Sequence, residues 1–199
     1  MSGLKKVYFP KDNQNLKYLG AQAFKQSGFT PENTFSKSFT IENLPNSITY
    51  IGEQCFRTSG VVLDALPNSL EYLGPDAFRY CQNVTFSKIP LGVTTLLGGT
   101  FAWCENITIN HFGREKTSDV LGAEENNISI IAPIAMESSA NVICGSRVTE
   151  IVIGNSVEYI GEYAFNNFGS VSGLTVDDDS GKINDDNVIT IFGRSVDRV

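Results

Sequence analysis

Short segments with a hydrophobic residue at every second position recur along this chain, and each is followed by a proline. They read Phe39-x-Ile41-x-x-Leu44-Pro45, Val61-x-Leu63-x-x-Leu66-Pro67 and Val84-x-Phe86-x-x-Ile89-Pro90. Such alternation, rich in β-branched and aromatic residues, predicts a short β-strand with one buried face. The proline is expected to end the strand because its nitrogen has no hydrogen to donate to the ladder.

A second short strand is predicted after each proline or its equivalent, over residues 47–51, 69–73 and 156–160, and glycine follows it at Gly52, Gly74 and Gly161. Glycine at these places indicates either a positive φ or the close approach of another backbone. The next segment, around Ala77 and Phe78, is predicted to form a single helical or 3₁₀ turn.

Strand, glycine and turn repeat together as one unit. Six units align on the pattern apolar-Gly-x-x-Ala-Phe and end at Phe24, Phe56, Phe78, Phe101, Met136 and Phe165. The interval is 22 residues from Phe56 to Phe78 and 23 from Phe78 to Phe101. A period of this length is typical of a solenoid, in which each turn buries its apolar residues against its neighbours. The chain is therefore predicted to be a mainly β solenoid of about six turns with short parallel strands.

The longer intervals predict insertions near residues 28–38 and 113–124. The solenoid is predicted to occupy residues 1–176. Residues 177–199 are predicted to form an acidic turn and a strand, at 188–192, that closes the stack or docks on a partner.

One unit matches a known repeat closely. In LPNSLEYLGPDAFRYC the residues on the motif are Pro67, Ser69, Leu70, Leu73, Gly74, Ala77, Phe78 and Cys81. The string resembles the BspA-like (treponemal-type) leucine-rich repeat, and the resemblance covers the chain from Leu4 to about Val176. The chain departs from the motif at the insertions and at Gly154, Met136, Leu97 and Ala132. The resemblance implies a right-handed leucine-rich-repeat solenoid that recognises proteins, with relatives on bacterial and protozoan surfaces and in phage-encoded proteins.

Composition excludes several partners. The net charge is −7, which disfavours a nucleic-acid surface and anionic lipid, since both require clustered Lys and Arg. No apolar run approaches the roughly 20 residues of a membrane helix. The start, MSGLKKVYFP, lacks the apolar core of a secretion signal. A virion or a surface-associated assembly is therefore the expected location, with the cytoplasm as the alternative; a chain excised from a longer protein is also possible.

Four cysteines, Cys55, Cys81, Cys104 and Cys144, occupy positions that other units fill with small or apolar residues. Buried thiols are the expected state, and the alternative is a disulfide between Cys81 and Cys104. Their spacing is not that of a zinc site.

No enzyme constellation is present, so the chain is predicted to be non-enzymatic, with no cofactor and no metal. His111 follows a strand predicted at residues 107–109, has no partner at a recognisable spacing, and is interpreted as an ordinary surface or turn histidine. The acidic run at residues 177–183 is out of register for a calcium loop.

Tyrosine recurs just before the apolar-Gly pair, at Tyr18, Tyr50, Tyr72 and Tyr159. Tyr50 and Tyr72 are predicted to be outward-facing ladder neighbours whose rings stack. Such cross-strand pairs contribute on the order of 0.2–1 kcal/mol each, so packing alone can explain them. Tyrosine also anchors interfaces, so the stripe is a candidate binding site.

Two further candidate sites remain. The polar insertion near 113–124 carries Arg114 and Lys116, and recognition residues concentrate in such loops; a tolerated surface insertion is the alternative. No polar cap precedes Leu4, Val7 and Phe9, so the N-terminal face is predicted to meet another chain, a copy or a larger assembly.

Two functions are consistent with these features. The first is recognition of a protein or glycan, as an adhesion or receptor-binding component of a surface or phage particle. The second is a structural virion subunit that holds an assembly together.

Overall fold

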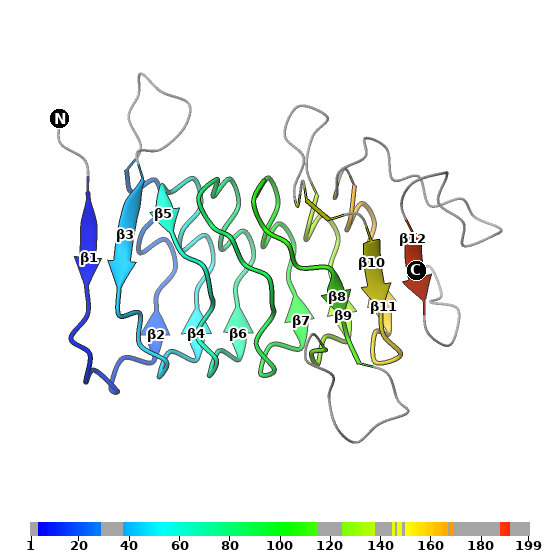
Figure 1. Cartoon of the computed structure of the whole chain (residues 1–199), viewed down its shortest axis with the longest axis horizontal. Helices are drawn as coiled ribbons and strands as arrows, with labels where there is room; N and C mark the ends of the chain where they lie inside the picture. Colours follow the sequence, from blue (N-terminus) through cyan, green and yellow to red (C-terminus); the bar gives the residue numbers. More distant parts are fainter. Residues whose placement is uncertain are drawn as a thin grey trace.

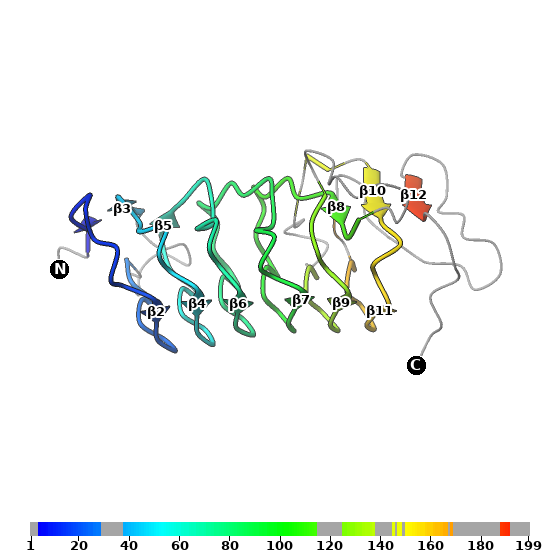
Figure 2. The same cartoon turned by 90° about the horizontal axis from the view of Figure 1, so that it is seen from below.

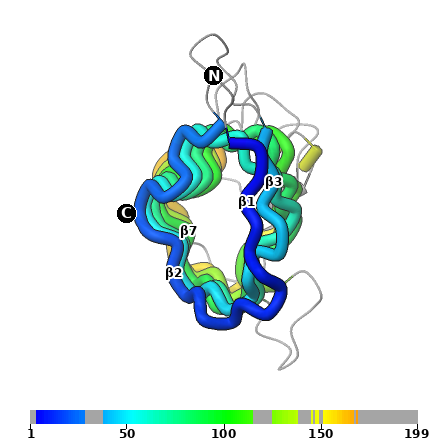
Figure 3. The backbone as a smooth tube through the Cα atoms, turned by 90° about the vertical axis from the view of Figure 1, so that its left-hand side faces the viewer, coloured from blue at the N-terminus to red at the C-terminus, as the bar shows by residue number. Residues whose placement is uncertain are grey.

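The computed structural model describes residues 4–28, 38–114, 125–137, 145, 147–148, 150–166, 168 and 188–191. Successive stretches of chain lie side by side along one axis and form an elongated stack of coils (Figure 1, Figure 2). Seen along that axis, the coils superimpose, and two columns of strands lie on opposite sides of the stack (Figure 3). The predicted solenoid of short parallel strands is confirmed.

The first column contains β1 (Lys6–Tyr8), β3 (Phe39–Glu42), β5 (Val61–Val62), β8 (His111–Phe112), β10 (Glu150–Ile153) and β12 (Val188–Ile191). The second contains β2 (Tyr18–Leu19), β4 (Tyr50–Ile51), β6 (Tyr72–Leu73), β7 (Thr95–Leu96), β9 (Ile130–Ile131) and β11 (Tyr159–Ile160). All pairings within these columns are parallel. The strand predicted near the C-terminus is present as β12, which pairs with β10.

Two strand predictions need correction in the middle of the first column. Residues 84–86 form only an isolated bridge, between Leu63 and Val84. His111 was predicted to follow a strand at 107–109, but it lies inside β8 and pairs with Val152. Segment 107–109 contacts the preceding coil through a hydrogen bond from the Thr108 amide to the Phe86 carbonyl (2.8 Å), not through a ladder.

The turns that follow the second column contain no helix within the described residues. In the coil of β6, the amides of Ala77, Arg79 and Cys81 each donate to the carbonyl three residues earlier. The intervening amides of Asp76, Phe78 and Tyr80 donate to the next coil at 2.9–3.0 Å. Asp76 and Tyr80 have φ of 55° and 61°, and left-handed residues cannot continue a right-handed helix. The predicted helical turn is therefore a series of tight turns that also bonds to the next coil.

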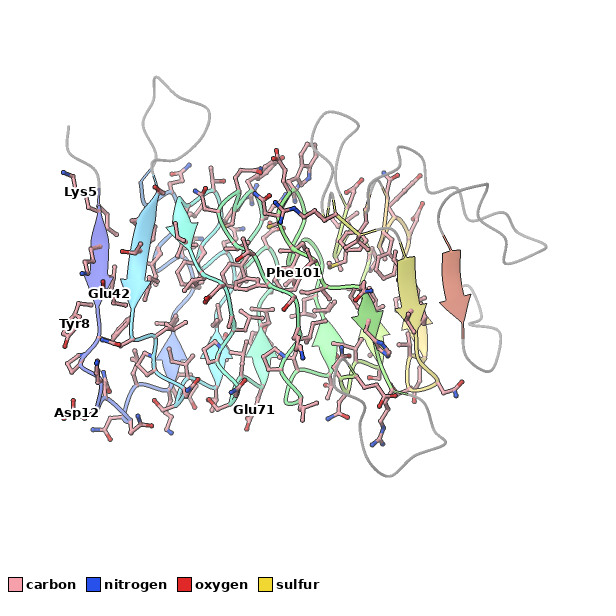
Figure 4. The ribbon with its side chains drawn as sticks, in the orientation of Figure 1. Lys5, Tyr8, Asp12, Glu42, Glu71 and Phe101 are labelled. Carbon is pink, nitrogen blue, oxygen red and sulfur yellow. The ribbon has the colours of Figure 1, made fainter. Side chains whose placement is uncertain are left out.

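A column of phenylalanines fills the interior. The rings of Phe24, Phe56, Phe78 and Phe101 are stacked in that order, with centroids 5.2, 5.0 and 6.0 Å apart. The last three are fully buried, whereas Phe24, in the first coil, is half-buried. Figure 4 shows Phe101 midway along the stack. In the later coils, Met136 and Phe165 occupy the same repeat position and are also buried.

The repeat glycines allow the coils to approach one another. A Cβ on Gly74 would lie 2.5 Å from the Glu53 nitrogen, and one on Gly52 would lie 2.6 Å from the Ala21 nitrogen. Neither glycine has a positive φ. Of the two reasons predicted for glycine at these positions, a positive φ is therefore wrong and the close approach of another backbone is confirmed. A Cβ on Gly20, in the first coil, would have no atom within 4 Å.

Candidate functional site

Tyr18, Tyr50 and Tyr72 form one row across β2, β4 and β6. The sheet register pairs Tyr18 with Tyr50 and Tyr50 with Tyr72. The ring centroids of Tyr50 and Tyr72 are 4.6 Å apart with planes 5° from parallel, and those of Tyr18 and Tyr50 are 5.6 Å apart. The predicted stacking of Tyr50 on Tyr72 is confirmed. We call these three residues the tyrosine row.

The tyrosine row faces outward because its neighbours in the strands face inward. Leu19, Ile51 and Leu73 are buried, and successive side chains of a strand point to opposite faces. Tyr18 is 67% exposed and Tyr72 38%. Desolvation, and then the nearby Tyr50 and Glu53, raise the pKa of Tyr72, so its hydroxyl stays a hydrogen-bond donor through the physiological range.

Tyr159 does not join the tyrosine row. It pairs with Ile130 on β9, which in turn pairs with Thr95 on β7. Two residues without aromatic rings therefore separate Tyr159 from Tyr72 along the column, and the four predicted tyrosines are not one continuous site.

The insertion residues are only partly described. Arg114 is exposed, and its amide donates to Ser156 Oγ at 2.9 Å. Lys116 and the rest of residues 115–124 lie outside the described residues, as do residues 29–37 of the other insertion.

The N-terminal face exposes apolar side chains. Leu4 is 40% exposed, and Val7 and Phe9 are half-buried against the core. β1 pairs with β3 along one edge, and no strand of the described residues pairs with its other edge (Figure 1).

Cys55, Cys81 and Cys104 are buried, as predicted, and no disulfide joins Cys81 to Cys104. The thiols of Cys81 and Cys104 donate to the carbonyls of Phe56 and Phe78, at 2.9 and 3.0 Å. Burial raises the pKa of Cys55 and of Cys81 to about 12, so both remain protonated and unreactive near neutral pH. Cys144 lies outside the described residues.

His111 and the acidic side chains were the sequence's candidates for catalysis or metal binding. The Nε2 atom of His111 is buried and has no hydrogen-bond partner among the described residues. This differs from the predicted surface histidine because β8 holds the residue within the sheet. Within the described ranges, no group of three or more His, Cys, Asp or Glu side chains could hold a metal ion, and no helix could cross a membrane. The acidic run at 177–183 lies outside these ranges.

A cluster that was not predicted lies in the turns after β6 and β7. The rings of Tyr80 and Trp103 are 5.0 Å apart, and the Arg79 guanidinium carbon lies 5.3 Å from the Tyr80 centroid. The Gln82 amide nitrogen donates to the Trp103 carbonyl at 2.9 Å. We call Arg79, Tyr80, Gln82 and Trp103 the Trp103 cluster. Tyr80 and Trp103 each stand two residues after a repeat phenylalanine, and this shared position is the signal that could have identified them.

Comparison with known proteins identifies the repeat. A family model described as BspA type leucine rich repeat region matches residues 29–120 and 135–188 in 6 copies. Modules of this family generally bind proteins or surfaces and are typically non-enzymatic. A search of curated proteins and a search of solved structures each gave no match.

Proposed function

Because the chain belongs to the BspA type leucine-rich repeat family, we propose that it is a recognition module whose tyrosine row binds another protein, as an adhesion or receptor-binding component. The observation that carries this proposal is the row of contacting rings on one sheet, in which Tyr18 and Tyr72 are exposed and Tyr50 between them is half-buried.

Stacked tyrosines suit a binding surface for two reasons. Tyrosine combines a large contact area with a hydroxyl and few rotatable bonds, and it is enriched among the residues that dominate binding energy. The sheet and the neighbouring rings already hold Tyr50 in place, since it stacks on Tyr72 and the Tyr18 ring contacts it on the other side at a tilt of 52°. A partner therefore does not have to order these side chains, which lowers the entropic cost of association.

An array of purified extracellular and cell-surface proteins tests this proposal. Proteins bound by the wild type should lose about tenfold or more in affinity for the Tyr50→Ser/Tyr72→Ser variant. Tyr8→Ser is the matched control, because Tyr8 is 60% exposed but belongs to β1 in the other column (Figure 4). Equal losses for both variants, or binding that survives the double change, would contradict the proposal.

The N-terminal face supports a second candidate, a structural subunit of an assembly such as a virus particle. An apolar end next to an unpaired strand edge favours pairing with another chain, and Leu4, Val7 and Phe9 supply that apolar end. The wild type should associate with rising concentration in sedimentation velocity, and Leu4→Asp should weaken that association. A single monomeric species at high concentration for both proteins argues against this candidate.

The location proposed for either role is a virus particle or another surface-associated assembly, with the cytoplasm as the alternative. Immunoblots of purified particles and of cytoplasmic fractions distinguish the two: enrichment in particles supports the assembly, and recovery only from cytoplasm argues against it.

A further inference from the structure

The Trp103 cluster has the composition of a ligand site on a surface apart from the strands that carry the tyrosine row. It lies in the turns that connect the two columns, where Tyr80 and Trp103 come from successive coils. Both side chains are half-buried. Their rings are tilted by 37° and form a compact aromatic patch, not a long groove.

Two guanidinium groups lie beside this patch, although the chain as a whole is acidic. Arg57 and Arg79 share one carboxylate: their guanidinium nitrogens lie 3.0 and 3.3 Å from the two oxygens of Asp76. Two guanidinium groups on one carboxylate leave one positive charge in this group of three. A patch of this sign attracts an anionic group, and a guanidinium binds a carboxylate in a two-point geometry.

Gly99 helps to create this arrangement. It has φ of 69°, and a Cβ there would collide with Asp76 Oδ1. In earlier coils the residue at the position of Gly99 has a side chain that bonds a cation of the preceding coil: Gln54 accepts from Lys25, and Asp76 accepts from Arg57. Gly99 has no side chain to offer Arg79. Arg79 lacks such a partner from the following coil and bonds Asp76 of its own coil instead.

Within the described residues, three polar atoms of the Trp103 cluster are buried without hydrogen-bond partners: Arg79 Nε, Trp103 Nε1 and Gln82 Oε1. The first two are donors and the third is an acceptor. Buried polar atoms are nearly always paired in folded proteins, so three unpaired atoms in one cluster need an explanation. A ligand rich in hydroxyl groups, which both donate and accept, would supply the missing bonds to Arg79 Nε and Gln82 Oε1 once these two side chains rotate toward the surface.

The backbone here cannot receive a peptide strand. The amides of Phe78 and Tyr80 already donate to Thr100 and Ala102 in the next coil, at 2.9 and 3.0 Å. Strand addition requires an unpaired edge, so a ligand at this place must be recognised through side chains.

We propose that the Trp103 cluster binds a saccharide that carries a carboxylate. The C–H face of the sugar ring packs on Tyr80 and Trp103, whose ring faces are weakly negative and attract such groups. The carboxylate meets the Arg79 guanidinium, and rotation of the flexible Arg79 and Gln82 side chains brings their unpaired atoms to the sugar hydroxyls. This site is independent of the tyrosine row, so either proposal can fail without the other.

Intrinsic fluorescence reads this site directly, because Trp103 is the chain's single tryptophan. Two acidic probes, 3′-sialyllactose and a hyaluronan tetrasaccharide, are titrated with excitation selective for tryptophan, and lactose serves as the neutral counterpart. At least one acidic probe should shift the emission saturably, with an affinity about tenfold or more above that of lactose. Arg79→Gln should remove that advantage, and Arg79→Lys should restore part of it, because lysine keeps the charge but not the two-point geometry.

Lys25→Gln is the matched control, since Lys25 holds the position equivalent to Arg79 two coils away and bonds Gln54. It should leave the titration unchanged, and melting curves should show that all variants are folded. Absence of a saturable shift with both acidic probes overturns the proposal. Three other results would also overturn it. The first is an affinity for lactose equal to that for the acidic probes, and the second is an unchanged affinity of Arg79→Gln for the acidic probes. The third is saturable binding of an oligoglutamate peptide when none of the sugars causes a response.

Discussion

The phenylalanine column and the tyrosine row are two aromatic stacks built by the same repeat. Phe56 and Phe78 are 5.0 Å apart with planes 9° from parallel, and Tyr50 and Tyr72 are 4.6 Å apart with planes 5° from parallel. Yet Phe78 is fully buried, whereas Tyr72 is 38% exposed. The spacing of the coils sets the ring geometry in both stacks, and burial alone distinguishes their roles.

This difference assigns stability to one stack and leaves the other available for recognition. Removing a buried aromatic ring loses its transfer from water and leaves a cavity. Removing an exposed ring from a cross-strand pair loses only a small contact energy. Similar stacking geometry therefore does not imply an equal contribution to stability.

The largest expected effect comes from breaking the buried stack. Phe78→Ala should lower the free energy of unfolding by about 3–5 kcal/mol, because Phe78 contacts Phe56, Phe86 and Phe101. Urea denaturation measures the loss. A loss below about 1 kcal/mol, as expected of an exposed ring, would contradict the account.

The next effect tests whether close contact between coils sets the spacing that both stacks share. Gly74→Ala should cost about 1–3 kcal/mol, since its Cβ would meet backbone atoms of Gly52 and Glu53 that cannot rotate away. Gly20→Ala, at the same repeat position in the first coil, should change stability by less than about 0.5 kcal/mol. Thermal melts of the two variants give the comparison, and similar losses would contradict the spacing argument.

The pH dependence of stability tests whether the interior beside the phenylalanine column excludes water. The pKa of Cys55 and of Cys81 is raised from 9.0 to about 12 by burial. Above pH 9 the unfolded chain loses thiol protons that the folded chain keeps, so stability is full below pH 9 and falls as the pH rises toward 12. Each thiol contributes up to about 1.4 kcal/mol per pH unit to this fall.

The Cys55→Ala/Cys81→Ala variant supplies the control. Its stability should fall less steeply than that of the wild type when urea midpoints are compared between pH 9 and pH 11. Parallel curves would show that these thiols are accessible to water in the folded protein.

The smallest effect belongs to the exposed stack. Tyr72→Ser should cost on the order of 0.2–1 kcal/mol, because Tyr72 stacks only on Tyr50 and remains partly in water. Differential scanning calorimetry should show a shift of a few degrees at most. A destabilisation as large as that of Phe78→Ala would mean that the tyrosine row is a structural element.

Both aromatic stacks could be predicted from the sequence, whereas the backbone conformation of the turns and the strand that contains His111 could not. The similar intervals of 22 and 23 residues between Phe56, Phe78 and Phe101 predict their alignment, and the tyrosine position predicts the outward row. The positive φ of Gln54, Asp76 and Tyr80 is not visible in the sequence, because these residues rarely adopt it and inter-coil hydrogen bonds impose it here. The placement of His111 in β8 depends on pairing with Val152, a partner that local alternation does not reveal.

The Trp103 cluster could be predicted from the sequence only in part. The shared repeat position of Tyr80 and Trp103 is readable in the sequence, but the contact of Arg57 and Arg79 with one carboxylate is not. It depends on Gly99 leaving space for Asp76, which becomes evident only when the coils are stacked.

Binding measured on two variants tests the central claim most directly. Tyr50→Ser/Tyr72→Ser alters only the exposed stack, and Phe78→Leu weakens only the buried one. Each is assayed, under conditions in which it is folded, against the array proteins that the wild type binds. The account predicts lost binding with a nearly unchanged melting temperature for the first variant, and a lowered melting temperature with retained binding for the second. Retained binding by the tyrosine variant together with a large drop in its melting temperature would contradict it.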